Sequence, residues 1–267
     1  MHMGESALAD TGRNFGLSGA ALKWIAMITM LIDHIGAVVM EYGLYYQGGA
    51  ETFRRLLDSG NGQWLYTFQR LMRMVGRPSF LLYSFLLVEG FFHTRSRKRY
   101  TFQMLLFALI SEIPFDLAAS NRWFYLGYQN VFFEFLIGLT VLWGMEQAVI
   151  FGKTLLTVEA GKIFAVALGC MAAVFIQADY DYIGIIIIAA FYEFHASRVG
   201  HSLSAAVLGG LETLDLNFGI GALAAIPIWF YNGKRGLSLK YFFYIFFLIT
   251  AFIKAVIRCF RIMDFRF

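Results

Sequence analysis

Two adjacent ionisable residues lie deep in an apolar part of this chain. Asp33 and His34 stand near the end of an apolar run that begins at about Leu17. Roughly a dozen apolar residues precede the pair, which corresponds to about 20 Å of helix. An imidazole suits proton transfer because its ordinary pKa lies close to neutral pH. We therefore predict that His34 is the general base of an active site.

The groups that assist this histidine are expected to come from other helices. Adjacent helical residues point in different directions, so Asp33 is predicted to pair with a cation such as Arg77 instead of orienting His34. A carboxylate from another helix, either Glu112 or Asp116, is predicted to orient the imidazole. These two carboxylates are four residues apart and therefore share one helical face.

Other polar side chains are expected around the same cavity. Arg77 and Asn130 are candidates for polarising or positioning a substrate, and Asp179 and Asp181 flank a turn between two apolar stretches. Glu89 lies in the inner half of its span. Charged groups in hydrocarbon are costly unless they are paired or wetted, which favours a shared cavity. Aspartates near helix ends have a simpler alternative as solvated or capping groups.

The composition places these residues in a membrane protein. Hydrophobic residues make up 59% of the 267 residues and charged residues only 15%, whereas soluble domains are about one quarter charged. A chain of this length cannot bury so much apolar surface in a water-facing globule. The composition excludes disordered, collagen-like and nucleic-acid-binding classes, so the expected surroundings are a lipid bilayer and not nucleic acid. We predict an all-α, polytopic transmembrane helical bundle that forms a single domain over residues 1–267, with a polar tail at 1–16.

Apolar stretches of suitable length predict about nine membrane spans. The segment 63–74 has apolar residues at helical spacing and is predicted to be an amphipathic helix lying in the membrane interface. Pro114, which lies between Glu112 and Asp116, has a simpler alternative as the mark of a helix end. The spans are expected near 20–40, 76–93, 101–117, 130–150, 157–177, 182–195, 202–215, 217–232 and 240–258.

Basic residues predict the orientation of the bundle, because they gather in cytoplasmic loops. The densest run, Arg95, Arg97, Lys98 and Arg99, lies between the second and third spans. This places the N-terminus in the cytoplasm and the C-terminus outside, in a multi-pass protein of a bacterial inner membrane.

The cysteines and the remaining histidines do not indicate a metal site. Cys170 and Cys259 lack CxxC spacing, and His195 and His201 are six residues apart, which fits no common zinc pattern. No metal cofactor is expected.

Nine stretches of the chain carry motifs that can be compared with known families: Leu22–Gly36, Gly76–Arg77, Phe85–Phe91, His93–Arg95, Leu109–Asp116, Gln129–Phe133, Asp179–Tyr180, Ile183–Gly184 and Lys240–Tyr244. In chain order and over nearly the whole length, these stretches resemble the TraX family of membrane proteins. The last of them is followed by a departure: the family's Pro-x-His is absent after Phe247, and the tail beyond that residue no longer resembles the family. A second departure is Leu81, which follows Phe80 where the family usually has proline.

The resemblance implies an integral membrane acetyltransferase that takes its acetyl group from acetyl-CoA. The family is named for the N-terminal acetylation of conjugative pilin, so the implied acceptor is an amine or hydroxyl of a pilin-like peptide, or of another protein or glycan, at the outer side. Arg95, Arg97, Lys98 and Arg99 are then predicted to hold the CoA phosphates, with a plain topology signal as the alternative. Glu89 is predicted to line the path of this donor. Direct transfer and an acetyl-His34 intermediate both remain open.

Two other function classes fit the same residues. In a proton-coupled transporter, the intramembrane carboxylates and His34 would form a relay, although the sequence contains no convincing internal repeat. In a non-enzymatic assembly protein, the atypical tail would accompany a loss of activity.

Overall fold

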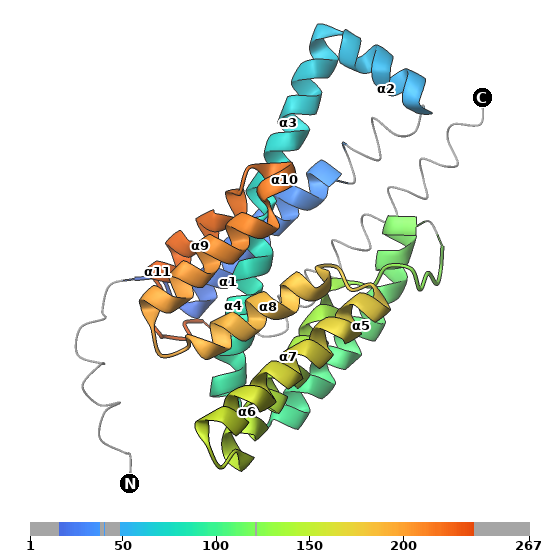
Figure 1. Cartoon of the computed structure of the whole chain (residues 1–267). Coiled ribbons are helices and arrows are strands. Elements are labelled where there is room, and N and C mark those ends of the chain that lie inside the picture. Colours follow the sequence, from blue (N-terminus) through green and yellow to red (C-terminus); the bar gives the residue numbers. More distant parts are fainter. Residues whose placement is uncertain (1–15, 38–39, 41–48, 121, 238–267) are drawn as a thin grey trace.

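A computed structural model describes residues 16–37, 40, 49–120 and 122–237, and within them every regular element is a helix (Figure 1). This confirms the predicted all-α class for the described part of the chain. Residues 1–15, which hold most of the polar tail, and the last predicted span at 240–258 lie outside the described residues. The elements are α1 Gly19–His34, α2 Gly49–Asp58, α3 Gly60–Gly76, α4 Pro78–His93, α5 Arg97–Ser120, α6 Val131–Phe151, α7 Leu155–Ile176, α8 Asp181–Glu193, α9 Arg198–Glu212, α10 Leu214–Asn217, the 3-10 helix η2 Ile220–Ala224 and α11 Ala225–Trp229.

Side-chain caps fix where three of these helices begin. The Ser18 hydroxyl accepts a hydrogen bond from the backbone N–H of Ala21 at the start of α1. The Asn130 side-chain oxygen does the same for Phe132 at the start of α6, at 2.9 Å. Thr154 forms a capping box at the start of α7. Each cap satisfies a backbone N–H that the helix leaves without an internal partner.

Within the described part of the chain, four helices are long and apolar enough to cross a membrane, which identifies a membrane protein. They are Gly19–Ala37, Gly60–His93, Val131–Phe151 and Leu155–Ile176. The structure does not confirm nine spans, because the helices at three of the predicted positions, α8, α9 and η2 with α11, are shorter than a full crossing requires.

The predicted interfacial helix at 63–74 is helical but is not a separate helix. The backbone stays helical through Arg77, so α3 and α4 form one helix of 34 residues, Gly60–His93. Such a helix is about 51 Å long, against about 30 Å for a hydrocarbon core. In Figure 1, α3 accordingly projects past the rest of the bundle toward α2. The apolar face of the segment includes Trp64, which is 78% exposed.

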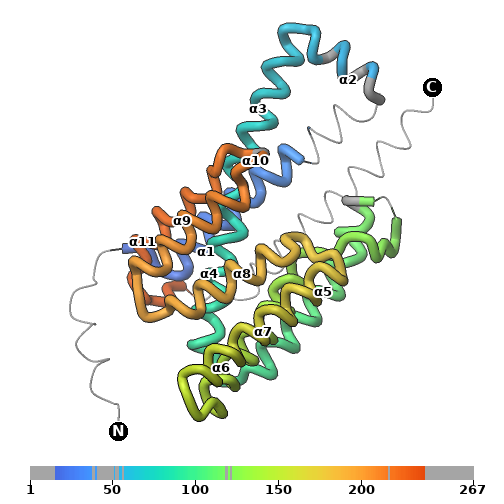
Figure 2. The backbone as a smooth tube through the Cα atoms, in the orientation of Figure 1, coloured from blue at the N-terminus to red at the C-terminus, as the bar shows by residue number. Residues whose placement is uncertain are grey.

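The helices form two groups that meet at α4 and α8. One group contains α1, α9, η2 and α11, and the other contains α5, α6 and α7 (Figures 1 and 2). Helix α8 contacts α6 and α7 on one side and α4 and α9 on the other. Phe85 of α4 and Phe191 of α8 are fully buried and meet edge to face at this junction. The junction leaves one long cavity beside α4.

Candidate functional site

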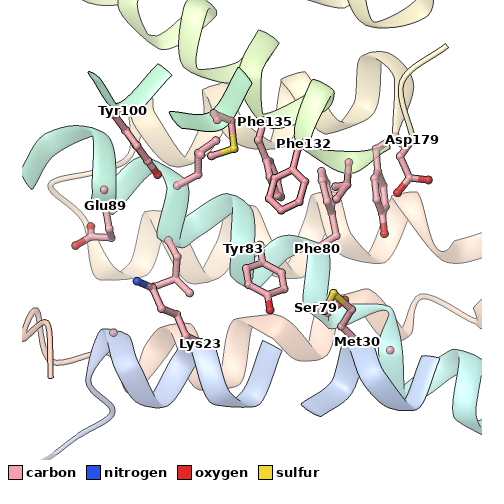
Figure 3. A pocket seen from close by; sticks show the side chains of 18 of the residues that line it. Lys23, Met30, Ser79, Phe80, Tyr83, Glu89, Tyr100, Phe132, Phe135 and Asp179 are labelled. Carbon is pink, nitrogen blue, oxygen red and sulfur yellow. The ribbon is translucent and has the colours of Figure 1, made fainter. Parts of the chain in front are cut away.

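The cavity has a volume of about 1180 Å³ and is lined by side chains from most of the helices. Figure 3 shows Glu89 and Tyr100 at one end of it, Asp179 at the other, and Phe80 and Tyr83 between them. The two ends differ in charge, and the middle is largely aromatic and aliphatic.

One end of the cavity is rich in carboxylates, and we call it the acidic end. Among the described lining residues, it is formed by Asp33, Asp179, Asp181 and Glu212, with the two guanidinium groups of Arg73 and Arg77 and the imidazole of His34. Four carboxylates against two guanidinium groups leave this end negative. Tyr128 donates a hydrogen bond to Asp179. Burial, together with that carboxylate, raises the pKa of the Tyr128 phenol, so it remains a donor.

His34 lies at this end beside a charged pair. Its Nδ1 atom is 3.5 Å from Oδ2 of Asp33, and the same Oδ2 accepts a 2.7 Å hydrogen bond from Arg73 Nη1. Both carboxylate and imidazole are largely buried, at 17% and 20% side-chain exposure. Directly after the pair, the helix changes to wider π turns at 35–37, a feature frequent at functional sites.

This geometry corrects two predictions about Asp33. The cation bonded to it is Arg73, one helical turn before the predicted Arg77, although Arg77 also lines the cavity. Asp33 is also the carboxylate found next to the His34 imidazole, contrary to the expectation that neighbours on one helix would point apart. Arg73 of α3 therefore binds the Asp33 carboxylate, and that carboxylate in turn lies beside the His34 imidazole.

The predicted orienting carboxylates, Glu112 and Asp116, are engaged elsewhere and do not line the cavity. Glu112 accepts hydrogen bonds from the side chain of Asn130, while Asp116 accepts one from the backbone N–H of Tyr125 at 2.7 Å. These bonds fasten α5 to the start of α6 and to the preceding loop. The roles predicted for Glu112, Asp116 and Asn130 in the site therefore find no support in the geometry.

Helix α5 also runs on through Pro114 to Ser120, so the alternative in which this proline marks a helix end was wrong. A proline inside a helix removes one backbone hydrogen bond. Membrane helices tolerate this because neighbouring groups satisfy the freed carbonyl.

The middle of the cavity is walled by stacked rings. Phe80 of α4 stacks on Tyr180 with ring centroids 3.5 Å apart, and on Phe135 of α6 at 5.8 Å. Tyr83, one turn along α4 from Phe80, also lines this part, and Figure 3 shows its ring facing α1 between Lys23 and Met30. The wall is apolar enough to keep a bound organic group away from bulk water.

The opposite end carries an excess of cations, and we call it the basic end. Among the described lining residues, it is formed by Lys23, Arg95, Arg99 and Arg235, with His93 and the single carboxylate of Glu89. Of the four predicted phosphate-binding residues, Arg95 and Arg99 line the cavity and Arg97 and Lys98 do not. Arg97 instead donates to Glu146 at 2.6 Å and lies over the ring of Phe91.

Charged residues of the cavity that were not named as site candidates from the sequence include Lys23, Arg73 and Arg235. Lys23 had a readable signal, since it precedes His34 by eleven residues, which is close to three full turns and puts both on one face of α1. Arg73 had a similar signal, because it lies four residues before Arg77. Arg235 follows the last described helix, and its position depends on tertiary packing.

Comparison with known proteins identifies the family of this chain. The TraX protein family matches residues 18–258. The chain belongs to the TraX family. This TraX match continues eleven residues past Phe247, so the expectation that the resemblance ends there was wrong.

One curated relative is the probable fimbrial assembly protein FimC, serogroup H1, of Dichelobacter nodosus. It is 28% identical over 257 residues, covering 88% of this chain and 93% of the relative. No solved structure matches the chain.

Proposed function

We propose that this TraX-family protein is a membrane-embedded acetyltransferase of the bacterial inner membrane. It moves an acetyl group from cytoplasmic acetyl-CoA to an amine or hydroxyl acceptor at the outer side. The observation that carries the proposal is one continuous cavity with a basic end, an aromatic middle, and an acidic end that holds His34.

The basic end suits the donor. Coenzyme A carries several phosphate charges at one end and its thioester at the end of a long flexible arm. Lys23, Arg95, Arg99 and Arg235 supply cations for the phosphates. Along α4, twelve residues separate Glu89 from Arg77, which corresponds to about 18 Å. A donor bound by its phosphates at the basic end would extend its thioester along this length toward His34.

The acidic end suits proton transfer. Asp33 faces Nδ1 of His34, which favours the tautomer with the proton on Nδ1 and makes Nε2 the basic nitrogen of the ring. In direct transfer, the acceptor nitrogen or oxygen attacks the thioester carbonyl carbon while His34 takes the acceptor proton. The carbon–sulfur bond then breaks, and the CoA thiolate leaves with a proton returned from the imidazolium or from solvent. Arg77 is placed to stabilise the oxyanion that forms between these steps.

The relative's name suggests the class of acceptor. Because that protein is named for fimbrial assembly, we propose a fimbrial or pilin-like subunit as the acceptor in this protein too. The amine at the N-terminus of such a subunit would approach from the acidic end, whose negative charge attracts it.

Radiolabelled acetyl-CoA tests the proposal directly. Membranes that contain the wild-type protein, with a pilin-like peptide supplied, should transfer label to the peptide, and membranes with the His34→Ala variant should not. Equal labelling in both would remove His34 from the mechanism. Label trapped on the protein itself would favour an acetyl-enzyme intermediate.

A non-enzymatic assembly role is the second candidate, favoured by the fimbrial assembly name of the relative. Under that function, fimbriae would fail to assemble in a deletion strain, and the His34→Ala protein would restore them. A transporter would instead move label across sealed vesicles without forming a new covalent product.

A further inference from the structure

Glu89 is a buried carboxylate in the middle of the basic end, and the transfer chemistry above does not use it. It lies in the last turn of α4 and is 9% exposed. A carboxylate at a site for phosphate groups repels its ligand unless its own charge is occupied. Its partners therefore indicate what it does.

Three segments far apart in the sequence meet on this carboxylate. The Tyr231 hydroxyl donates to Oε2 at 3.0 Å, and Nε2 of His195 lies 3.4 Å from Oε1. Nδ1 of His93 lies 3.9 Å from Oε2 and 2.8 Å from the backbone oxygen of Glu89. The contacts join the end of α4, the turn between α8 and α9, and the segment that follows α11.

Two of these partners are themselves held by aromatic rings. The His195 ring lies tilted against Phe92 with centroids 3.7 Å apart. Phe85 packs edge to face against Tyr231 at 5.2 Å. Burial and the nearby Glu89 carboxylate raise the pKa of Tyr231, so its hydroxyl remains a donor.

The joined segments carry the cations of the basic end. Arg95 and Arg99 follow His93 by two and six residues, and Arg235 follows Tyr231 by four residues. Lys23 is linked to the segment after α11 through the backbone, because the start of α1 forms backbone hydrogen bonds with that segment. There, Leu17 N–H donates to Phe230 O at 2.8 Å and Gly19 N–H donates to Lys234 O at 2.8 Å.

We propose that Glu89 is a positioning residue for the donor, and that it holds the four cations of the basic end at the spacing that binds the phosphate groups of acetyl-CoA. This inference rests on the proposed function for its ligand. The contacts by which Glu89 joins the three segments belong to the fold, so their effect on the basic end can be measured without any transfer reaction.

The test uses the full-length protein in membranes, with Cys170 and Cys259 replaced by alanine and a cysteine at Thr94→Cys. Thr94 lines the basic end, so the rate at which a maleimide labels this cysteine reports how closed that end is. The adenosine bisphosphate part of coenzyme A, which has no thiol, serves as the protecting ligand. The variants are Glu89→Gln, Glu89→Ala and Tyr231→Phe.

The matched control is Glu193→Ala. Glu193 lies at the end of α8 and bonds to Lys162 at 3.0 Å, but it does not line the cavity. The substitution therefore removes a carboxylate that bridges α7 and α8, and it leaves the residues of the basic end unchanged.

We expect Glu89→Ala to label about tenfold faster than the parent and to need about tenfold more nucleotide for half-protection, the effect of losing a charged hydrogen-bonding partner. Glu89→Gln should stay near the parent, because its amide oxygen still accepts from Tyr231. In the transfer assay, Glu89→Ala should raise KM for acetyl-CoA and leave kcat nearly unchanged. That split distinguishes positioning from a general loss of structure.

Unchanged labelling and protection in Glu89→Ala would overturn the proposal, as would an equal effect in Glu193→Ala. If Glu89→Ala is not recovered from membranes, Tyr231→Phe decides, since it must shift both measurements in the same direction. If the parent protein transfers no acetyl group, the proposed function fails, while the labelling rates without nucleotide still decide whether Glu89 holds the basic end together.

Discussion

At His34, the chemistry depends on which ring nitrogen carries the proton. The Asp33 carboxylate lies on the Nδ1 side and is itself held by Arg73. This arrangement leaves Nε2 as the basic nitrogen and fixes the ring with a charged partner. The carboxylate, imidazole and guanidinium form a short chain in which each group restrains the next.

Replacing His34 with alanine should lower acetyl transfer by about 100-fold or more, the usual contribution of a general base. Insertion into the membrane should be unaffected, because alanine is small and apolar. Transfer rates in membranes and the amount of protein recovered from them check both parts. A His34→Gln protein that stayed active would indicate hydrogen bonding instead of proton transfer.

The choice between orienting carboxylates can be tested by two matched amide substitutions. Asp33→Asn should lower kcat by about 100-fold, because the imidazole loses the charge that supports its protonated form. Glu112→Gln should remain near wild type, since the amide oxygen still accepts from Asn130 and the site is not touched. Loss of activity in Glu112→Gln with retention in Asp33→Asn would restore the arrangement expected from the sequence.

At the scale of the helices, the site depends on how closely α1 approaches the α3–α4 helix. Gly76 makes this approach possible, because a β-carbon there would collide with the side chain of Asp33. Arg73, three residues earlier, then reaches the same carboxylate. The close crossing at one glycine therefore places both the carboxylate and its cation.

Gly76→Ala tests this crossing against the intrinsic preference of a helix for alanine. Helix propensity alone would favour alanine by about 1 kcal/mol, whereas overpacking costs about 1–3 kcal/mol. We expect a lower melting temperature in detergent and a large loss of transfer, because Asp33 must move. Gly60→Ala is the control, since a β-carbon at Gly60 meets nothing within 4 Å. Equal tolerance of both substitutions would show that the crossing does not need glycine.

The sequence predicted these helices well and their contacts less well. Apolar runs mark helix positions because that signal is local. Arg73 and Arg77 share one face of their helix, so local spacing cannot say which of them meets Asp33. That depends on the axial offset between α1 and α3, which is set by packing at Gly76. The same limit applies to Glu112, whose partner Asn130 lies eighteen residues away.

At the scale of the whole molecule, the charge of the cavity follows the predicted orientation of the bundle. The basic end adjoins the run at 95–99 that predicts a cytoplasmic loop, and His34 lies at the acidic end. Donor and acceptor would therefore enter from opposite sides of the membrane.

Cysteine labelling tests this orientation without any assay of activity. With Cys170 and Cys259 replaced, a cysteine at Ser96→Cys should resist an impermeant thiol reagent in intact cells, and one at Ser120→Cys should react. The reason is that cationic loops remain in the cytoplasm. Labelling of Ser96→Cys but not Ser120→Cys would invert the bundle and place the acidic end toward acetyl-CoA.

Sealed membrane vesicles of known orientation provide a direct test of acetyl transfer from a cytoplasmic donor through His34. Radiolabelled acetyl-CoA is added outside the vesicles, with a pilin-like peptide enclosed within them. Inverted vesicles, which expose the cytoplasmic face, should label the enclosed peptide, and the His34→Ala variant should abolish this labelling. Right-side-out vesicles should not transfer label from externally added acetyl-CoA to the peptide. Equal transfer in both orientations, or transfer that persists in the His34→Ala variant, would contradict this mechanism of acetyl transfer.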